Sequence, residues 1–189
     1  SADARDVYYS LDLEHFHHQF KAAIEGLHPA LGDPQPVSAA RSADPTRPRA
    51  RVLFLCTHNS ARSQLAEALL RHLAGGRVEV FSAGSEPGAV HPQALAVLER
   101  QGVAADGLYS KSVAQFVGQH FDYVITVCDR AKESCPIFPG DPERIHWSFA
   151  DPSAVATEEQ PLAFTQTFVG LEKRLKLLLT LIDRERGAA

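Results

Sequence analysis

Short apolar runs alternate with longer amphipathic segments through the chain after residue 50. An uninterrupted apolar run of strand length suits a strand that is buried on both faces of a parallel sheet. Apolar residues that recur every three or four positions indicate a helix with one buried face. The predicted strands cover residues 52–55, 78–81, 123–127 and 144–148. The predicted helices cover residues 65–74, 92–101 and 112–119, and a last helix begins near residue 157.

This alternation predicts a doubly wound α/β fold, in which helices flank a four-stranded parallel sheet. Gly75 is expected to end the first helix, because glycine adopts the left-handed conformation that commonly terminates helices. Thr157 and Gln160 are spaced as a capping box at the start of the last helix. The apolar stripe of that helix consists of Phe164, Phe168, Leu171, Leu175, Leu178 and Ile182.

The first 50 residues have a different pattern, so the chain is predicted to divide near residue 50. Residues 29–50 hold five of the twelve prolines and almost no large apolar residue, and we expect them to form an extended linker. Residues 1–28 are predicted to form a short strand–helix extension with apolar residues at helical spacing. This extension is too small to bury its apolar face alone. Residues 51–189 form the main domain in this interpretation.

Composition and charge exclude several classes of protein. The chain has 189 residues, of which 44% are hydrophobic and 22% charged, as in an ordinary globular protein. A formal net charge of −4 disfavours binding to nucleic acid through its phosphates. No run of 18 apolar residues occurs, so no membrane span is expected. The three cysteines are an odd number, which disfavours a secreted disulfide framework and favours reduced cysteines in the cytoplasm.

The segment from Cys56 to Ser63 carries the strongest chemical signal. It reads Cys-x5-Arg-Ser, follows a predicted strand and opens a predicted helix. The backbone N–H groups of such a loop can surround an oxyanion, and the helix N-terminus adds positive potential. Arg62 offers a planar fork for two anion oxygens, Ser63 can donate to the Cys56 sulfur, and the same field favours a thiolate nucleophile. The alternative is a buried structural cysteine beside a surface arginine. The candidate oxyanion-binding residues are Thr57, His58, Asn59, Ser60, Ala61 and Arg62.

This loop resembles the signature of the low-molecular-weight protein tyrosine phosphatase superfamily. Ser82-Ala83-Gly84 and Asp151-Pro152 also match, and the resemblance covers residues 51 to about 185. It implies that Asp151 is the general acid, because the departing oxygen must gain a proton. Asp151 follows the last predicted strand and would lie at the same sheet edge as Cys56. The alternative is that Asp151 only initiates a turn.

The other two cysteines indicate which group within this superfamily the chain resembles. The segments that contain Cys128 and Cys135 resemble the arsenate reductases that thioredoxin recycles. The resemblance implies that arsenate, with phosphate and sulfate as competing oxyanions, binds in the loop and that Cys56 attacks its arsenic atom. Cys128 would then form a disulfide with Cys56. Cys135 would attack this disulfide, and the resulting Cys128–Cys135 disulfide would be reduced by external thioredoxin. No tightly bound cofactor is expected. Half of a zinc site and inert core cysteines are the alternatives.

Such a relay has a geometric requirement. In a helix, the seven steps from Cys128 to Cys135 would separate their Cα atoms by roughly 10 Å, whereas a disulfide needs less than ~7 Å. A helix in this segment of the reduced protein must therefore unwind on oxidation. The sequence predicts a redox-switched loop over about residues 128–140.

A monovalent cation is a further open question. Some members of the resembled superfamily bind potassium through residues that match Asn59, Glu67, Ser82 and a later Asp. Val113 stands at the position of that Asp, and the nearby Lys111 offers a positive charge instead. A weak cation site near Asn59, Glu67 and Ser82 is thus an alternative, and no other metal site is expected.

The N-terminal extension has its own resemblance. Residues 6–13 resemble the end of the wing and the last helix of arsenic-responsive winged-helix repressors. This implies a remnant that could form a homodimer through its helix but could not read DNA. A regulator or oligomerisation module is therefore one alternative function for the chain.

A phosphatase of small phosphate esters is the other alternative. It would use Cys56, Arg62 and Asp151 alone. Tyrosine phosphatases usually carry a Tyr pair after the Asp-Pro step, and this chain has Ser153-Ala154 there. An aryl-phosphate pocket is therefore not evident in the sequence.

Overall fold

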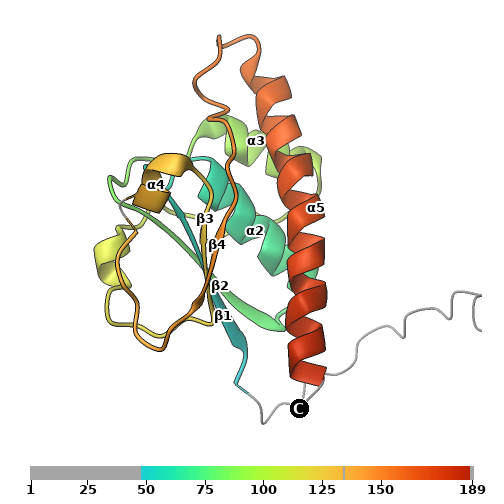
Figure 1. The fold of residues 1–189 in the computed structure, drawn as a ribbon. Coiled ribbons are helices and arrows are strands. Elements are labelled where there is room, and N and C mark those ends of the chain that lie inside the picture. Colours follow the sequence, from blue (N-terminus) through green and yellow to red (C-terminus); the bar gives the residue numbers. More distant parts are fainter. Residues whose placement is uncertain (1–47, 134, 188–189) are drawn as a thin grey trace, which may run out of the picture. The chain divides into compact units, whose positions relative to one another are not determined.

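The computed structural model describes residues 48–133 and 135–187 (Figure 1). The predicted extension 1–28, its dimer contact and almost all of the predicted linker 29–50 lie outside the described residues. The strands are β1 (Ala50–Cys56), β2 (Val78–Gly84), β3 (Tyr123–Thr126) and β4 (Glu143–His146). The helices are α2 (Arg62–Ala74), α3 (Pro92–Arg100), α4 (Asp129–Glu133) and α5 (Gln160–Gly187), with a 3₁₀ turn η2 (Val113–Gln115).

The strands form one four-stranded parallel sheet in the order β2-β1-β3-β4, which confirms the predicted fold. The central strand β1 is buried except at Arg51, as expected for a strand covered on both faces. Because all strands run in the same direction, their carboxyl ends share one edge of the sheet. The strands end there at Cys56, Gly84, Thr126 and His146. This edge is where ligands bind in open α/β sheets.

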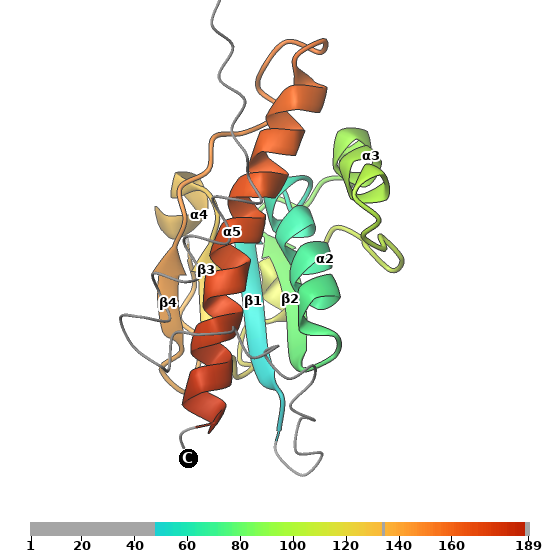
Figure 2. The ribbon, with the colours of Figure 1, turned by 90° about the vertical axis from the view of Figure 1, so that its right-hand side faces the viewer.

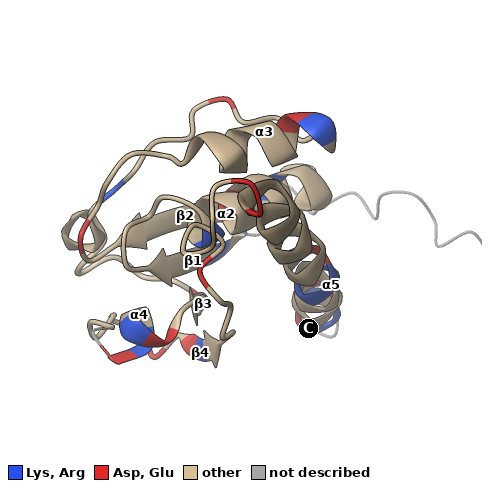
Figure 3. Cartoon of the chain, turned by 90° about the horizontal axis from the view of Figure 1, so that it is seen from above, with Lys and Arg blue, Asp and Glu red and all other residues tan. Residues whose placement is uncertain are grey.

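Helices cover both sides of the sheet. In Figures 1 and 3, α2 and α5 lie on one side, and α4 lies on the other. Helix α3 contacts both α2 and α5, and Figure 2 shows it beside α2. The predicted apolar stripe of α5 is buried along its whole length. Helix α2 ends as predicted at Gly75, which adopts the left-handed conformation with φ 54°.

Two local predictions were wrong. The predicted helix over residues 112–119 is only the 3₁₀ turn η2, and Gly118 (φ 84°) turns the chain away soon after it. The capping box does not form either. The Gln160 side chain donates to the carbonyls of Ser153 and Val155 at 3.3 and 3.4 Å, so it holds the preceding loop instead of capping Thr157.

Charged residues lie mainly on the outer surfaces. Figure 3 shows Lys, Arg, Asp and Glu on α4, on α5 and on connecting segments, and few on the central strands. Within the described residues, none of the helices combines the length and apolar character that crossing a membrane requires.

Candidate active site

The loop from Thr57 to Ala61 joins the end of β1 to the start of α2. Cys56 is the last residue of β1 and is only 3% exposed. Asn59 adopts a left-handed conformation, with φ 45°, and this turns the chain back toward α2. The end of β2 closes tightly on this loop, because a Cβ atom at Gly84 would lie 2.5 Å from the Thr57 carbonyl oxygen. Only glycine fits this approach of two backbones.

Two donors point at the Cys56 sulfur. The Asn59 backbone N–H donates to it at 3.2 Å, and Ser63 Oγ lies 2.9 Å from it. The amide nitrogen of the Asn59 side chain donates to Ser63 Oγ at 2.8 Å. Because that oxygen accepts from Asn59, its own proton is available for the sulfur. The Cys56 sulfur thus has the Ser63 hydroxyl and one loop N–H group as hydrogen-bonding neighbours.

A buried network stands behind these contacts. Asn59 also donates to Ser82 Oγ at 2.7 Å, and the Ser82 hydroxyl donates to Glu67 on α2. The side-chain oxygen of Asn59 accepts from the Lys111 backbone N–H at 2.7 Å. Asn59, Ser82 and Glu67 are completely buried. The network therefore fixes the orientation of Asn59, and through it the position of Ser63.

Lys111 provides the positive charge beside Glu67. Its ammonium lies 3.1 Å from Glu67 Oε2 and donates to the Tyr109 carbonyl at 2.9 Å. Arg71 pairs with the other carboxylate oxygen of Glu67. A buried carboxylate needs such compensation, because desolvation otherwise disfavours its charge. Lys111 thus occupies the side of Glu67 near Ser82, where the sequence left a monovalent cation as an alternative.

Arg62 and Asp151 meet beside the loop. Arg62 Nη2 donates to Asp151 Oδ2 at 2.7 Å, and Arg62 Nη1 donates to the Phe149 carbonyl at 3.0 Å. Arg62 Nε is buried and has no hydrogen-bond partner among the described residues. An unpaired buried N–H is rare in proteins and leaves a donor for an anion oxygen. The structure thus places Ser63 at Cys56 and Asp151 at Arg62, at the two ends of the same loop.

The Asp151 carboxyl is held as an anion. Its burial opposes ionisation, but hydrogen bonds from Ser153 and the positive charges of Arg62 and His58 hold the pKa of Asp151 below its usual range. The Ser153 backbone N–H and hydroxyl donate to Asp151 Oδ1 at 3.0 and 2.7 Å. Paired in this way, Asp151 is ionised at neutral pH. A role as an acid would require a change at Arg62 that raises the proton affinity of Asp151.

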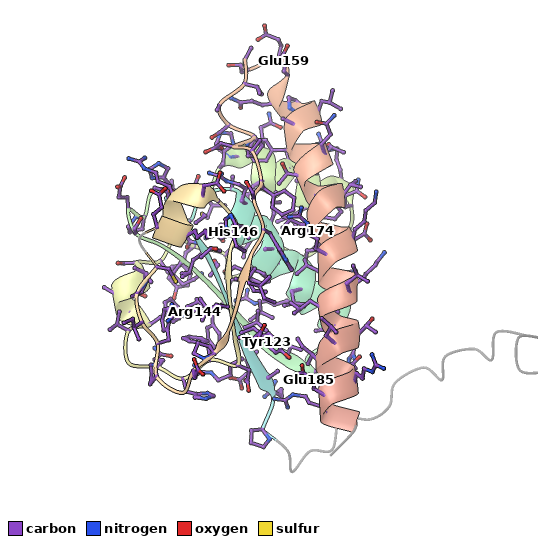
Figure 4. All side chains as sticks on the ribbon, in the orientation of Figure 1. Tyr123, Arg144, His146, Glu159, Arg174 and Glu185 are labelled. Atoms are coloured by element: carbon purple, nitrogen blue, oxygen red, sulfur yellow. The ribbon has the colours of Figure 1, made fainter. Side chains whose placement is uncertain are left out.

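The segment that carries Asp151 is supported by α5. Arg174 lies over the Phe149 ring, with its guanidinium carbon 4.3 Å from the ring centroid. A Cβ atom at Gly170 would lie 2.9 Å from the same ring. In Figure 4, Arg174 extends from α5 toward β4. These contacts fix Phe149, whose carbonyl in turn holds Arg62.

The second and third cysteines differ in their surroundings. Cys128 is buried, and its sulfur lies 3.5 Å from Thr57 Oγ1, in the residue next to Cys56. Cys135 lies beyond α4, is half-buried and contacts the carbonyl of Pro136. Burial raises the pKa of the Cys135 thiol, and Arg144 partly offsets this. Cys128 therefore shares the loop with Cys56, whereas Cys135 is the more accessible thiol.

Some site residues were not found from the sequence. Gln64 is completely buried and donates from one nitrogen to Asn59 Oδ1, at 3.0 Å, and to the Tyr109 carbonyl, at 2.8 Å. Ser110 donates to the carbonyl oxygens of His58 and Asn59 at 3.0 Å. Both residues stabilise the outer backbone of the loop. A polar residue in the first buried turn of α2 was the one signal available for Gln64.

His58 has a peripheral position. Its ring lies at the Glu86 carbonyl, with 3.1 Å between Nδ1 and that oxygen, and its side chain is 51% exposed. The His58 ring is therefore directed away from the Cys56 sulfur side of the loop, and only its backbone N–H group would be available to a bound anion. No group of three or more His, Cys, Asp and Glu side chains that could hold a metal ion occurs among the described residues.

A cysteine at the end of a strand, followed by a loop that opens a helix and lies beside an arginine and an aspartate, is the arrangement found in phosphatase-like enzymes that use a cysteine nucleophile. The family model for low molecular weight phosphotyrosine protein phosphatase matches residues 51–188. The chain belongs to this family.

Several curated proteins that are similar to this sequence are arsenate reductases. The arsenate reductase of Halalkalibacterium halodurans is 37% identical over 127 residues, which are 66% of this chain and 91% of the relative. The arsenate reductase of Bacillus subtilis is 36% identical over 116 residues, or 61% of this chain and 84% of the relative.

Solved structures give the same picture. The thioredoxin-dependent arsenate reductase Cg_ArsC1' of Corynebacterium glutamicum is similar with a TM-score of 0.59 and 28% identity, covering 90% of this chain and 72% of that one. An arsenate reductase in a phosphate-binding state is similar with a TM-score of 0.58 and 28% identity, covering 70% of this chain and 98% of that one.

The close approach of Gly84 to the loop gives a direct test. In Gly84→Ala, the new methyl group would lie 2.5 Å from Thr57 O and 2.7 Å from Asn59 N, so the loop must move outward. We expect the affinity for phosphate, measured by calorimetric titration, to fall at least about tenfold, or ~1.4 kcal/mol. Gly88→Ala is the matched control, because a Cβ atom there has no neighbour within 4 Å. Equal affinities in the two variants would contradict the packing argument.

The Lys111–Glu67 pair predicts indifference to potassium. In Lys111→Met, Glu67 loses a buried partner, and we expect the free energy of unfolding to fall by about 3 kcal/mol. The wild-type melting temperature should be equal in KCl and NaCl of the same ionic strength, whereas Lys111→Met should gain stability in KCl. Lys173→Met, at an exposed position of α5, controls for the lost charge. A potassium-specific stabilisation of the wild type would show that Lys111 does not replace a cation.

Proposed function

We propose that this protein is a thioredoxin-dependent arsenate reductase that works through a three-cysteine relay. The observation that carries the proposal is the position of Cys128, whose sulfur lies 3.5 Å from the side chain of Thr57, the residue next to Cys56. A phosphatase needs only the first thiol. The arsenate reductases among its relatives, one of them thioredoxin-dependent, support the same reaction for this chain.

The first step is attack on arsenic. Arsenate enters the loop, where backbone N–H groups and the unpaired Arg62 Nε take its oxygens. The Cys56 thiolate forms a bond to arsenic, and one oxygen leaves as water after gaining a proton from Asp151. The oxyanion draws Arg62 away from Asp151 and adds negative charge nearby. Both effects raise the proton affinity of Asp151, so the carboxylate takes up a proton from the entering hydrogen arsenate or from solvent and passes it to the departing hydroxyl group.

The second step transfers electrons. The Cys128 thiolate attacks the Cys56 sulfur, the sulfur–arsenic bond breaks, and its electron pair reduces As(V) to As(III), which leaves as arsenite. Cys135 then attacks Cys128, which forms the Cys128–Cys135 disulfide and restores the Cys56 thiol. The two thiols of thioredoxin reduce this disulfide. Because the relay needs free thiols, we assign the protein to a reducing compartment, the cytoplasm.

The relay requires movement of the segment after Cys128. Helix α4 (Asp129–Glu133) lies between Cys128 and Cys135. Helical spacing holds such cysteines too far apart for a disulfide, which needs Cα atoms within ~7 Å. We therefore infer that α4 opens when Cys135 attacks Cys128, within the predicted switch over about residues 128–140. The half-buried Cys135, with its raised pKa, is a poor nucleophile until this opening exposes it.

A phosphatase of small phosphate esters is the second candidate. Cys56, Arg62 and Asp151 would suffice for it, because these three groups bind an oxyanion, attack it and protonate its leaving group. The family match favours this reaction class in general terms. It would leave Cys128 and Cys135 without a chemical role.

Counting thiols separates the two candidates. Fully reduced protein is treated with one equivalent of arsenate without oxygen, and any disulfide is located by peptide mass. We expect two of the three thiols to be lost, one arsenite to be released and Cys128 to be linked to Cys135. Cys135→Ser should stop at a Cys56–Cys128 disulfide. Three free thiols without arsenite, together with phosphate-ester hydrolysis that survives Cys128→Ser, would establish the phosphatase instead.

In the proposed mechanism, the oxyanion replaces Asp151 as the partner of Arg62. The substitution Asp151→Asn should therefore have opposite effects on oxyanion binding and on turnover. The amide carries no charge to compete for Arg62, so phosphate should bind about threefold to tenfold more tightly, by ~0.7–1.4 kcal/mol. It also has no acidic proton to give, so thioredoxin-coupled arsenate turnover should fall about 100-fold.

Calorimetric titration and arsenite release measure the two effects, and Asp106→Asn, at an exposed position, is the control. A parallel loss of binding and turnover would indicate that Asp151 only shapes the loop.

A further inference from the structure

The contact between the end of β4 and the start of α4 lies outside the chemistry described so far. His146 ends β4, and Figure 4 places its side chain at the α4 end of that strand. Its Nδ1 lies 2.8 Å from Thr126 Oγ1, and its Nε2 lies 2.9 Å from Asp129 Oδ1. We call these three side chains the β4–α4 clamp. The Ser148 side chain also bonds to Asp129.

Both ring nitrogens of His146 are used in the β4–α4 clamp. Nε2 donates to the Asp129 carboxylate, and Nδ1 shares a hydrogen bond with the Thr126 hydroxyl, which can donate or accept. The parallel register of β3 and β4 pairs Thr126 with His146 and so fixes the ring from the sheet side. The ring therefore holds one defined orientation, with its donor directed at the first residue of α4.

The clamp acts on the residue next to Cys128. Asp129 directly follows Cys128, and Val127 directly precedes it. The Val127 backbone N–H donates to the Leu55 carbonyl at 2.8 Å. Cys128 is thus held on both sides, by β1 through Val127 and by β4 through Asp129. Its sulfur is directed to Thr57 at the loop.

The contribution of this clamp to stability is small. The Asp129 side chain is 75% exposed, and a contact that is this open to solvent contributes little to folding, whatever the charge of the imidazole. The clamp therefore adds little stability, and its main effect is to fix the backbone at Asp129. Asp129 directly follows Cys128, the second cysteine of the relay.

We propose that His146 is a positioning residue that holds Cys128 beside Cys56 and makes Asp129 the fixed end of the moving segment. The proposal rests on the three-cysteine relay of the proposed function. With Asp129 anchored, the opening of α4 brings Cys135 toward Cys128 and leaves Cys128 at the loop. The same anchor keeps Cys128 within reach of Cys56 during the preceding step.

The test measures how well Cys56 and Cys128 pair in the absence of arsenate. In a Cys135→Ser background, two protein thiols exchange with oxidised glutathione, which gives one protein disulfide and two reduced glutathione molecules. The equilibrium constant gives the effective concentration of the two thiols. We expect His146→Ala to lower it about tenfold and to leave the iodoacetamide reaction rate of Cys56 unchanged. A loss of general structure would change both.

Matched variants separate positioning from stability. His146→Gln keeps a donor for Asp129 and should recover most of the effective concentration. Asp129→Ala, at an exposed site that leaves the core intact, should reproduce His146→Ala, and the double variant should be no worse than either one. His72→Ala, at an exposed position of α2, is the control and should have no effect. Additive losses in the double variant, or an unchanged constant in folded His146→Ala, would overturn the proposal.

This experiment is independent of the substrate. Because glutathione drives the exchange, the result stands whether or not arsenate is reduced. Failure of the proposed function would appear as three thiols persisting with arsenate. Failure of the positioning role would appear as an equilibrium constant that does not depend on His146.

Discussion

The site depends on one buried side chain, Asn59, and on the close approach of β2 that keeps it in place. Its left-handed backbone turns the loop around the Cys56 sulfur, and its amide connects Ser63 to Ser82. Every polar atom of that side chain is used, so the group has one orientation. The hydrogen-bond network that runs from Ser63 through Asn59 and Ser82 ends at the negative charge of Glu67. Lys111 balances this charge. The shape of the loop and the reactivity of its thiol therefore have the same origin.

A second constraint is the competition for Arg62. With Asp151 and the Phe149 carbonyl as its partners, the arginine is preorganised but not fully satisfied, because its Nε remains open. In the proposed mechanism, an oxyanion gains that donor and changes the state of the carboxyl at the same moment. Binding and acid activation would then be coupled through one side chain. The sequence alone indicated a candidate acid and an arginine, and the geometry adds that the two side chains are hydrogen-bonded to each other.

The sequence was sufficient for the sheet, the buried stripe of α5 and the cluster of Cys56, Arg62 and Asp151, because these follow from apolar periodicity and from strand ends that share an edge. It failed at residues 112–119, where Gly118 overrode helical propensity, and at Gln160, whose side chain serves the loop before α5. Gln64 and the contacts of His146 could not be predicted either. The contacts of Gln64 and His146 join residues that are far apart in the sequence, and local sequence patterns do not predict such contacts.

The proposed relay is an ordered transfer, in which the thiol in the oxyanion loop reacts first and the most accessible thiol reacts last. The most direct test is a rapid-quench time course of a single arsenate turnover, in which each disulfide is identified by peptide mass. The account predicts that a Cys56–Cys128 disulfide appears together with arsenite and then decays as the Cys128–Cys135 disulfide forms. A time course in which the Cys128–Cys135 disulfide forms while Cys56 never enters a disulfide would contradict it.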